Sequence, residues 1–271
     1  MFDNIFSYDF MQHAFIAGTI ISLICGLISV FVVLRRSAFA VHSLGHTSLT
    51  GSSGAMLLGF SGITGQLVIN LLAAFVMGLL GDKIRKNDLA IGVVFSFFLG
   101  LGAYFLFLYH NNYAGGIMDV LFGNILAVSY YQIKVLLLLS AFIILSLIIC
   151  FRPLLFISID PVLAASKMVP AKLLNILYFL LIAVAVSMGC QIVGVLLIFV
   201  LMVLPGAIAS QWCKGLYKLI LLSVCISVLS IWGSLFLSYY FNLPISFCVT
   251  MILCLMYSIE ILKKALYKTS L

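Results

Sequence analysis

Long runs of apolar residues, separated by short polar segments, follow one another along the whole chain. A helix needs roughly 20 mostly apolar residues to cross the hydrocarbon core of a bilayer. The predicted spans are 14–34, 44–60, 64–80, 89–109, 131–151, 173–189, 191–209, 216–240 and 246–262. These runs are too long and too continuously apolar for the alternating strands of a membrane β-barrel. The pattern therefore predicts an all-α, polytopic membrane helical bundle of eight or nine spans, in one domain covering residues 1–271.

Composition agrees with a protein that faces lipid on most sides. Hydrophobic residues make up 65% of the 271-residue chain and charged residues 8%, and the mean hydropathy is +1.32. Soluble domains carry about 25% charged residues, enough for a polar shell that this chain cannot build. Residues 1–13 contain Asp3 and Asp9 but no Lys or Arg, so they lack the basic region of a cleavable signal.

The basic residues fall almost entirely on one side of the predicted membrane. With the N-terminus outside, Lys134 alone among the 14 basic residues lies outside, and the rest lie in inner segments. Because Lys and Arg accumulate in cytoplasmic loops, this distribution predicts an outer N-terminus and an inner C-terminus. It also accounts for the net charge of +7, so no basic face remains for nucleic-acid binding.

Two histidines stand out in a segment rich in small polar residues. His42 and His46 are four residues apart, a spacing that places both on one face of a helix. Neutral imidazole is a good ligand for Zn, Cu, Fe and Ni. From spacing alone two interpretations stay open, a shared metal site or two histidines that hydrogen-bond neighbouring helices. A membrane zinc protease is disfavoured, because Ser43 stands where HExxH places its catalytic glutamate.

A polar segment at 152–172 is predicted to form a cytoplasmic loop with a short helix. Asp160 is suited to cap this helix, Pro161 to occupy its first turn and Pro170 to stop it. Such a helix is either a docking surface for a soluble partner or a plain connection. On the outer side, residues 115–129 are too short to cross and are expected to be re-entrant or interfacial, with Asp119 as their only acid. In the span 191–209, Pro205 and Gly206 are expected to end the helix, and Gly194 to allow a close helix contact.

Five ordered motifs resemble one family, the permease subunits of bacterial ABC transporters that import zinc, manganese or iron(II). They are RRSAF followed by HSLGHTSLTG, then NDLAIGVVFSFFLGLG, LFGNILAVS, DPVLAASKMVP and VGVLLIFVLMVLPGAIAS, covering about 180 residues from 35 to 210. The resemblance implies a homodimeric all-α permease in the bacterial cell membrane, driven by two cytoplasmic ATPase subunits and supplied by an extracytoplasmic metal-binding protein. The permease itself would be no enzyme and would hold no permanent cofactor.

The resemblance also implies roles for particular residues. The family's Asp and His on the metal path fall on His42 and His46, and Asp119 is a further candidate ligand. The ATPase-coupling helix falls on about 160–168, with Asp160, Pro161, Val162, Leu163, Ala164 and Ala165 as coupling residues. Val162 and Leu163 would supply docking contacts, and the alanines would permit close approach.

Two positions depart from the family pattern, at the metal site and in the coupling helix. His42 replaces the family's Asp, and Met168 stands where the family usually has Gly. Losing the carboxylate favours zinc as the transported ion, with manganese or iron(II) as the alternative. A metal carrier that needs no ATPase is a second alternative, since the chain lacks a GxxxxGK[ST] motif of its own. A permease for iron-siderophore or corrin substrates is disfavoured, because such bulky substrates need no ion ligands in the path.

Overall fold

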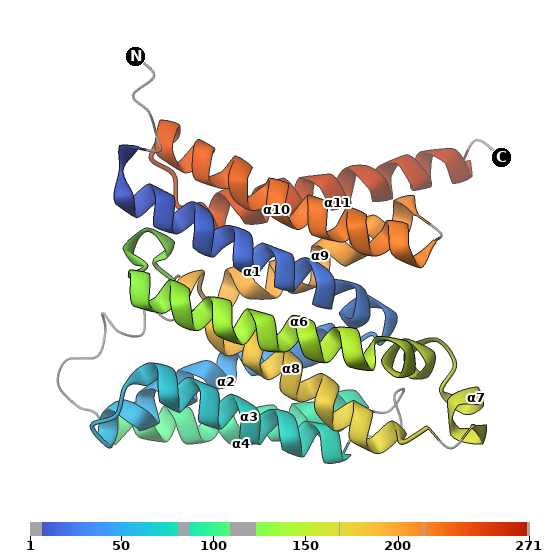
Figure 1. Ribbon diagram of the computed structural model, residues 1–271, viewed down its shortest axis with the longest axis horizontal. Helices are drawn as coiled ribbons and strands as arrows, with labels where there is room; N and C mark the ends of the chain where they lie inside the picture. The colour runs from blue at the N-terminus through green and yellow to red at the C-terminus, as the bar shows by residue number, and fades with distance from the viewer. Residues whose placement is uncertain (1–6, 81–86, 109–122, 168, 214, 270–271) are drawn as a thin grey trace.

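The computed structural model describes residues 7–80, 87–108, 123–167, 169–213 and 215–269, and in these segments the chain is helical and contains no strand (Figure 1). The helices are α1 (Asp9–Leu34), α2 (Ala38–Leu57), α3 (Gly62–Leu80), α4 (Asn87–Leu108), η2 (Ile125–Ala127), α6 (Tyr130–Ile159), α7 (Pro161–Ser166), α8 (Ala171–Ile192), α9 (Val195–Trp212), α10 (Leu216–Phe241) and α11 (Ile245–Thr269). Each predicted span falls on one of the long helices, which confirms the all-α membrane bundle.

One long helix differs in character from the rest. Among the described residues, eight helices are long and apolar enough to cross a membrane, and α2 is the long helix that does not qualify. Its polar side chains do not face lipid, because Ser43, Thr47 and Thr50 are all buried against neighbouring helices. The span predicted at 44–60 is therefore a helix enclosed by protein, which begins six residues and ends three residues earlier than expected.

Two predicted helix ends are wrong. α6 continues through Arg152 and Pro153 to Ile159 instead of ending at 151, and its last turns bury Leu154 and Ile157. α9 continues through Pro205 and Gly206 to Trp212.

The continuation of α9 has a local cause on α1. Pro205 lacks an N–H and disturbs the helical hydrogen bonds around it. The Ser29 hydroxyl repairs the gap, since it accepts from the Gly206 N–H at 2.8 Å and donates to the Val203 carbonyl at 3.2 Å. A neighbouring serine can satisfy freed backbone groups inside a membrane, so the proline is tolerated within the helix.

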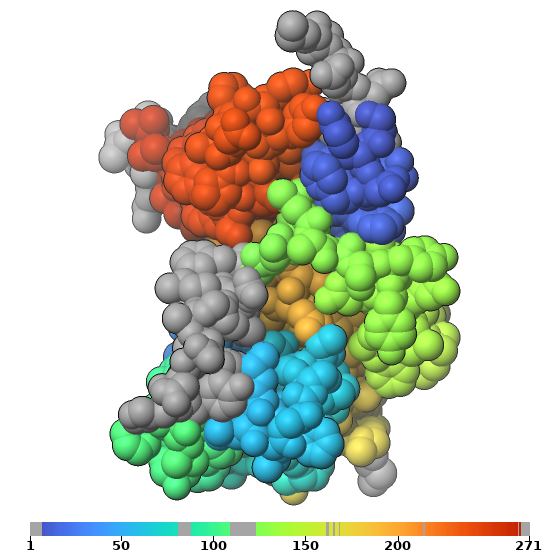
Figure 2. Space-filling view, turned by 90° about the vertical axis from the view of Figure 1, so that its left-hand side faces the viewer, coloured from blue at the N-terminus to red at the C-terminus, as the bar shows by residue number. Residues whose placement is uncertain are grey.

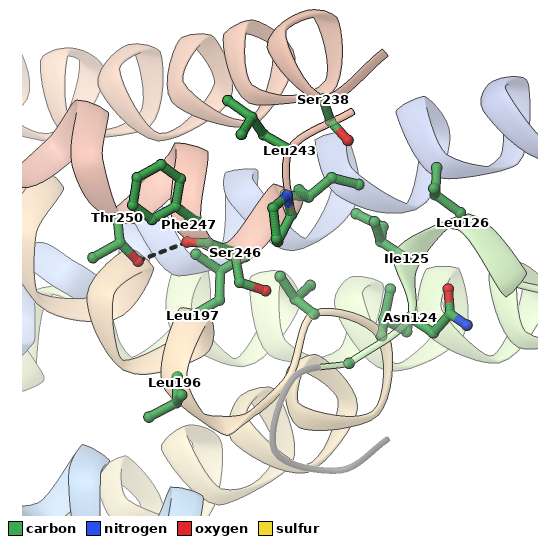
Figure 3. A pocket seen from close by; sticks show the side chains of 15 residues that line it. Asn124, Ile125, Leu126, Leu196, Leu197, Ser238, Leu243, Ser246, Phe247 and Thr250 are labelled. Carbon is green, nitrogen blue, oxygen red and sulfur yellow. Dashed lines mark hydrogen bonds between the residues drawn. The ribbon is translucent and has the colours of Figure 1, made fainter. Parts of the chain in front are cut away.

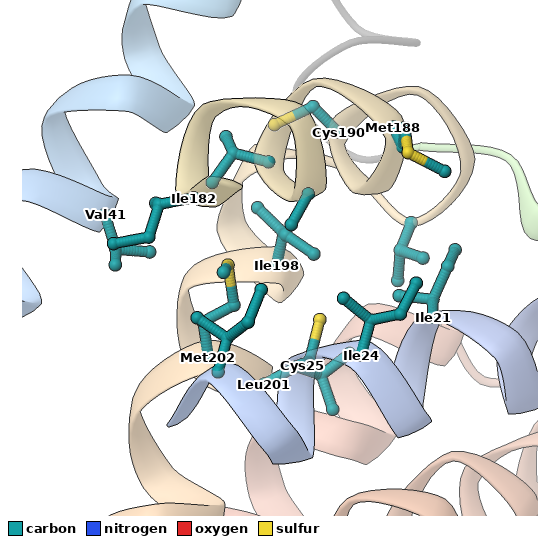
Figure 4. Packing of buried hydrophobic residues seen from close by; sticks show 14 of the residues in the cluster. Ile21, Ile24, Cys25, Val41, Ile182, Met188, Cys190, Ile198, Leu201 and Met202 are labelled. Atoms are coloured by element: carbon teal, nitrogen blue, oxygen red, sulfur yellow. The ribbon is translucent and has the colours of Figure 1, made fainter. Parts of the chain in front are cut away.

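α1 and α8 lie at the centre of the bundle. α1 packs against α9, α10 and α6, whereas α8 packs against α3 and joins α2, α6 and α9. In Figure 4, Ile24 and Cys25 of α1 lie near Leu201 and Met202 of α9, with Ile182 of α8 and Val41 of α2 at the edge of the same cluster. The outer helices α4, α6 and α11 surround this core and expose most of their side chains.

The connections gather at two ends of the bundle. One end, here termed the α7 end, holds α7, the α1–α2 junction and the end of α11 (right in Figure 1). The other, the η2 end, holds the start of α1, η2 and the α8–α9 and α10–α11 turns. Figure 2 looks onto the η2 end, with the start of α1 and the end of α10 above and the α2–α3 turn below. The start of α1 and the end of α11 therefore lie at opposite ends of the bundle, whereas the cytoplasmic assignment of the α7 end stays a prediction.

Candidate functional site

His42 and His46 lie side by side on one face of α2, as their spacing predicts. Their ring centroids are 4.6 Å apart and their planes meet at 74°. Both side chains are half-buried, whereas residues on the other sides of this helix, such as Ser43 and Thr47, are fully buried. The pair therefore occupies the most open face of an otherwise enclosed helix.

Two aromatic side chains from other helices flank the pair. The ring of Phe95 on α4 lies 6.3 Å from His42 and 6.0 Å from His46, and that of Phe199 on α9 lies 5.3 Å from His42. No group of three or more His, Cys, Asp or Glu side chains forms a metal cluster within the described residues. An ion held here would therefore be bound by two imidazoles and by water or groups beyond this set. Asp119 lies outside the described residues.

The small polar residues of α2 serve a close contact between helices. The Thr47 hydroxyl donates to Asn70 Oδ1 at 2.6 Å, and Asn70 Nδ2 donates to the hydroxyls of Ser48 at 2.7 Å and Ser187 at 2.9 Å. Gly51 and Gly65 bring α2 and α3 so close that a Cβ on Gly65 would fall 2.1 Å from the Gly51 carbonyl oxygen. This network joins α2, α3 and α8 and fixes the face on which the histidines lie.

A second polar cluster, which the sequence did not predict, lies where α2 begins. Arg35 is buried, and its Nη2 donates to Asn175 Oδ1 at 2.8 Å. The guanidinium carbon lies 4.2 Å from the centre of the Tyr178 ring, and the Tyr178 hydroxyl shares a hydrogen bond of 2.5 Å with Ser37. A cavity of about 20 Å³ adjoins Arg35 and is also lined by Asp88. The sequence contains one indication of this cluster, because Asn175 and Tyr178 are two polar side chains one turn apart in an apolar span.

The α7 segment confirms the predicted cap and changes the role of one residue. The Leu163 N–H donates to Asp160 Oδ1 at 3.0 Å, as expected of a capping aspartate. The helix ends at Ser166, whereas Pro170 precedes α8 rather than stopping α7. Ala164 is fully buried against Ile157 and Leu174 of the same chain, so it faces inward.

Leu163 is the coupling candidate that α7 presents to solvent, with 46% of its surface exposed. The side chains of Pro161, Val162 and Ala165, and the whole of Met168, lie outside the described residues. The docking role of this helix is not tested by the geometry and stays a prediction.

An apolar cavity of about 620 Å³ opens at the η2 end (Figure 3). Its lining comes from the η2 segment, the start of α9 and the α10–α11 turn, and includes Asn124, Leu196, Leu243 and Phe247. Among the described residues that line it, none is ionisable. The described part of the cavity wall therefore offers space at this end of the bundle but no charged ligands for an ion.

Gly194 has a different role from the one predicted. It precedes α9 with φ +90°, a conformation that favours glycine. Gly123, with φ +68°, lies against it, since a Cβ on Gly123 would fall 2.3 Å from the Gly194 nitrogen. The close contact thus joins two turns at the cavity wall and does not join two helices.

Residues 7–264 match the ABC 3 transport family. The manganese import system permease protein ScaB of Streptococcus parasanguinis is 30% identical over 92% of this chain and 89% of the relative. The manganese transport system membrane protein MntC of Halalkalibacterium halodurans is 30% identical over 88% of this chain and 81% of the relative.

A solved structure shares the arrangement of helices. PsaBC from Streptococcus pneumoniae, in complex with Fab, matches with a TM-score of 0.82 and 28% identity over 95% of this chain and 93% of that chain. The family match, the two relatives and the shared fold agree with the five motifs found in the sequence. The chain therefore belongs to the ABC 3 transport family, as a multi-pass membrane permease of a bacterial ABC-type metal importer.

Proposed function

We propose that this permease forms the membrane path of an ATP-driven importer of divalent manganese, with His42 and His46 as a transient metal site. The observation that carries the proposal is the histidine pair on the open face of α2, in a chain whose relatives include permeases named for manganese import. Two protein ligands leave most of the coordination sphere to water, which suits an ion that must be released after it binds. Asp119 is kept as a further candidate ligand.

The partners follow from the same family. We propose a dimer of the permease, two cytoplasmic ATPase subunits that dock at α7, and an extracytoplasmic binding protein at the η2 end. In this arrangement ATP hydrolysis belongs to the separate subunits and the permease supplies the path. The exposed Leu163 supports docking at α7, because an exposed apolar side chain on a capped surface helix suits a protein contact.

Zinc is a second candidate that one observation favours. The described part of the path presents two imidazoles and no carboxylate beside them. Zinc accepts nitrogen ligands readily, whereas manganese suits oxygen ligands. The names of the relatives support manganese, the alternative to zinc that the sequence left open, whereas the two imidazole ligands favour zinc.

Uptake of each metal by cells that lack this gene tests the proposal. Cells complemented with the whole transporter should accumulate manganese in an ATP-dependent manner, and zinc or iron(II) should compete poorly. Preferred zinc uptake would establish the second candidate. Absence of uptake of all three metals by a correctly assembled complex would overturn the proposed function.

A further inference from the structure

The helix that carries the histidine pair is joined to α8 by four polar side chains at the α7 end. These residues, here termed the α2–α8 joint, are Arg35, Ser37, Asn175 and Tyr178. Arg35 bonds Asn175 and stacks on Tyr178, while Tyr178 also bonds Ser37, the residue that immediately precedes α2. The joint therefore ties the α1–α2 junction, directly before α2, to the first two turns of α8.

Because the residues of the α2–α8 joint are buried, breaking their contacts is costly. Arg35 and Asn175 are each 5% exposed, and Tyr178 is 2% exposed. Separating the two helices here would leave a buried guanidinium without its partner, which is strongly unfavourable. Asn175 also donates to the Gly78 carbonyl on α3 at 3.2 Å, so the joint reaches the neighbouring helix as well.

A second bridge holds α2 to α8 further along both helices. Asn70 of α3 bonds Ser48 of α2 and Ser187 of α8 at the same time. His42 and His46 lie between Ser37 and Ser48, that is, between the two points of attachment. α2 cannot rotate or slide along α8 without breaking both bridges, so the histidines keep their position relative to α8.

At its other side, α8 is connected to the helix proposed to dock the ATPase. Leu174, beside Asn175 in the chain, packs on Ala164 of α7. We propose that the four residues of the α2–α8 joint are positioning residues that transmit movement of α7 to His42 and His46. α7, α8 and α2 then move as one block during transport. This inference rests on the proposed function, because it assumes a metal at the histidines and an ATPase at α7.

Coupling efficiency tests the joint in the complete transporter reconstituted in liposomes. Asn175→Leu removes the partner of Arg35 at similar size, and Tyr178→Phe removes only the hydroxyl that bonds Ser37. Both variants should retain ATP hydrolysis while importing several-fold fewer metal ions per ATP. Asn175→Asp, which keeps an acceptor for Arg35, should retain the parental ratio.

Ser230→Ala is the matched control, since its buried hydroxyl bonds only Ile226 within the same helix. A purely structural role would lower transport and ATP hydrolysis in proportion, with an unchanged ratio in Asn175→Leu and Tyr178→Phe. That result would overturn the inference.

A distance measurement tests the same block without any metal. Spin labels at Leu58, beyond α2, and Leu173, in α8, occupy exposed positions, after Cys150, Cys213, Cys225 and Cys254 are replaced by serine. The distance between the labels should be narrow and equal in nucleotide-free and ATP-bound complexes, and it should broaden in the Asn175→Leu/Tyr178→Phe double variant. A shift of several ångströms between the two parental states, or no broadening in the double variant, would contradict the block. If the parental complex imports no metal, the proposed function fails. The distance measurement would still show whether the α2–α8 joint holds the two helices together.

Discussion

At the scale of single residues, the sequence predicted that the two histidines lie together but did not predict which side chains surround them. A spacing of four residues is enough to place His42 and His46 on one helix face. Phe95 and Phe199 come from helices far away in the chain, and no local pattern indicates that they flank the pair. The same holds for Arg35, whose charge suggested only a cytoplasmic loop until its contacts with Asn175 and Tyr178 were seen.

Substitution of each histidine separates binding from selectivity. His46→Ala should abolish metal uptake while the complex still assembles, because one imidazole is a poor site. His42→Asp restores an oxygen ligand and should raise the ratio of manganese to zinc uptake by about tenfold, equivalent to about 1.4 kcal/mol. Radioactive metal uptake, with both ions in competition, measures the ratio.

His13→Ala is the control, since His13 lies near Tyr130 at the η2 end and away from the pair. Parental uptake by both His42→Ala and His46→Ala would show that the pair is structural, even though the family assignment would stand.

At the scale of elements, apolar runs predicted where helices lie but not where several of them end. The span predicted to stop at 151 continues for two turns, because Leu154 and Ile157 find buried positions that a hydropathy pattern cannot foresee. Pro205 predicted a helix end that Ser29, on the neighbouring helix α1, prevents. Helix ends depend here on tertiary partners, whereas the helices themselves depend on local composition.

The repair of α9 by Ser29 predicts a measurable loss of stability. Ser29→Ala removes the partner of the Gly206 N–H and leaves buried backbone groups unsatisfied, which costs about 1–3 kcal/mol. The variant should therefore unfold at a lower temperature in detergent. Ser210→Ala is the control, because its exposed hydroxyl bonds only Ala207 in the same helix. Equal melting temperatures for the two variants would refute the repair.

The two faces of α7 predict two kinds of failure. Leu163→Asp changes an exposed apolar side chain and should weaken capture of the ATPase without changing the stability of the permease. Ala164→Asp places a charge in the buried contact with Ile157 and Leu174, which is costly. That variant should still insert but lose both transport and thermal stability. Co-purification with the ATPase and melting in detergent distinguish the two outcomes, and normal transport by Leu163→Asp would argue against docking at this position.

At the scale of the whole molecule, alternation of the helices sends the two chain ends to opposite sides. The distribution of basic residues predicted that the two ends lie on opposite sides. Lys and Arg mark the inner loops, and their alternation along the chain requires an odd number of crossings. The packing of α1 against α9 and α10 was not predictable, since the close approach of Gly26 to Val224 joins residues almost two hundred positions apart.

Surface labelling in intact cells tests the orientation. In a chain without Cys225 and Cys254, a cysteine at Ser61, in the exposed α2–α3 turn, should react with a membrane-impermeant maleimide. A cysteine at Gly215, before α10, should react only after the membrane is opened. Reaction of both positions in intact cells, or protection of Ser61→Cys alone, would refute the predicted orientation.

The polar character of α2 has a consequence for how the chain enters the membrane during synthesis. A nascent helix partitions into lipid on its own apolarity, and α2 carries buried serines and threonines that hydrocarbon cannot solvate. Asn70 and Gly65, which accommodate those groups, are made only later, as part of α3. α2 is therefore expected to wait at the insertion machinery and to enter lipid with α3 as a hairpin. In a nascent chain halted before α3 has emerged, a cysteine placed in α2 should still react with a water-soluble maleimide, whereas in a chain halted beyond α3 it should be protected.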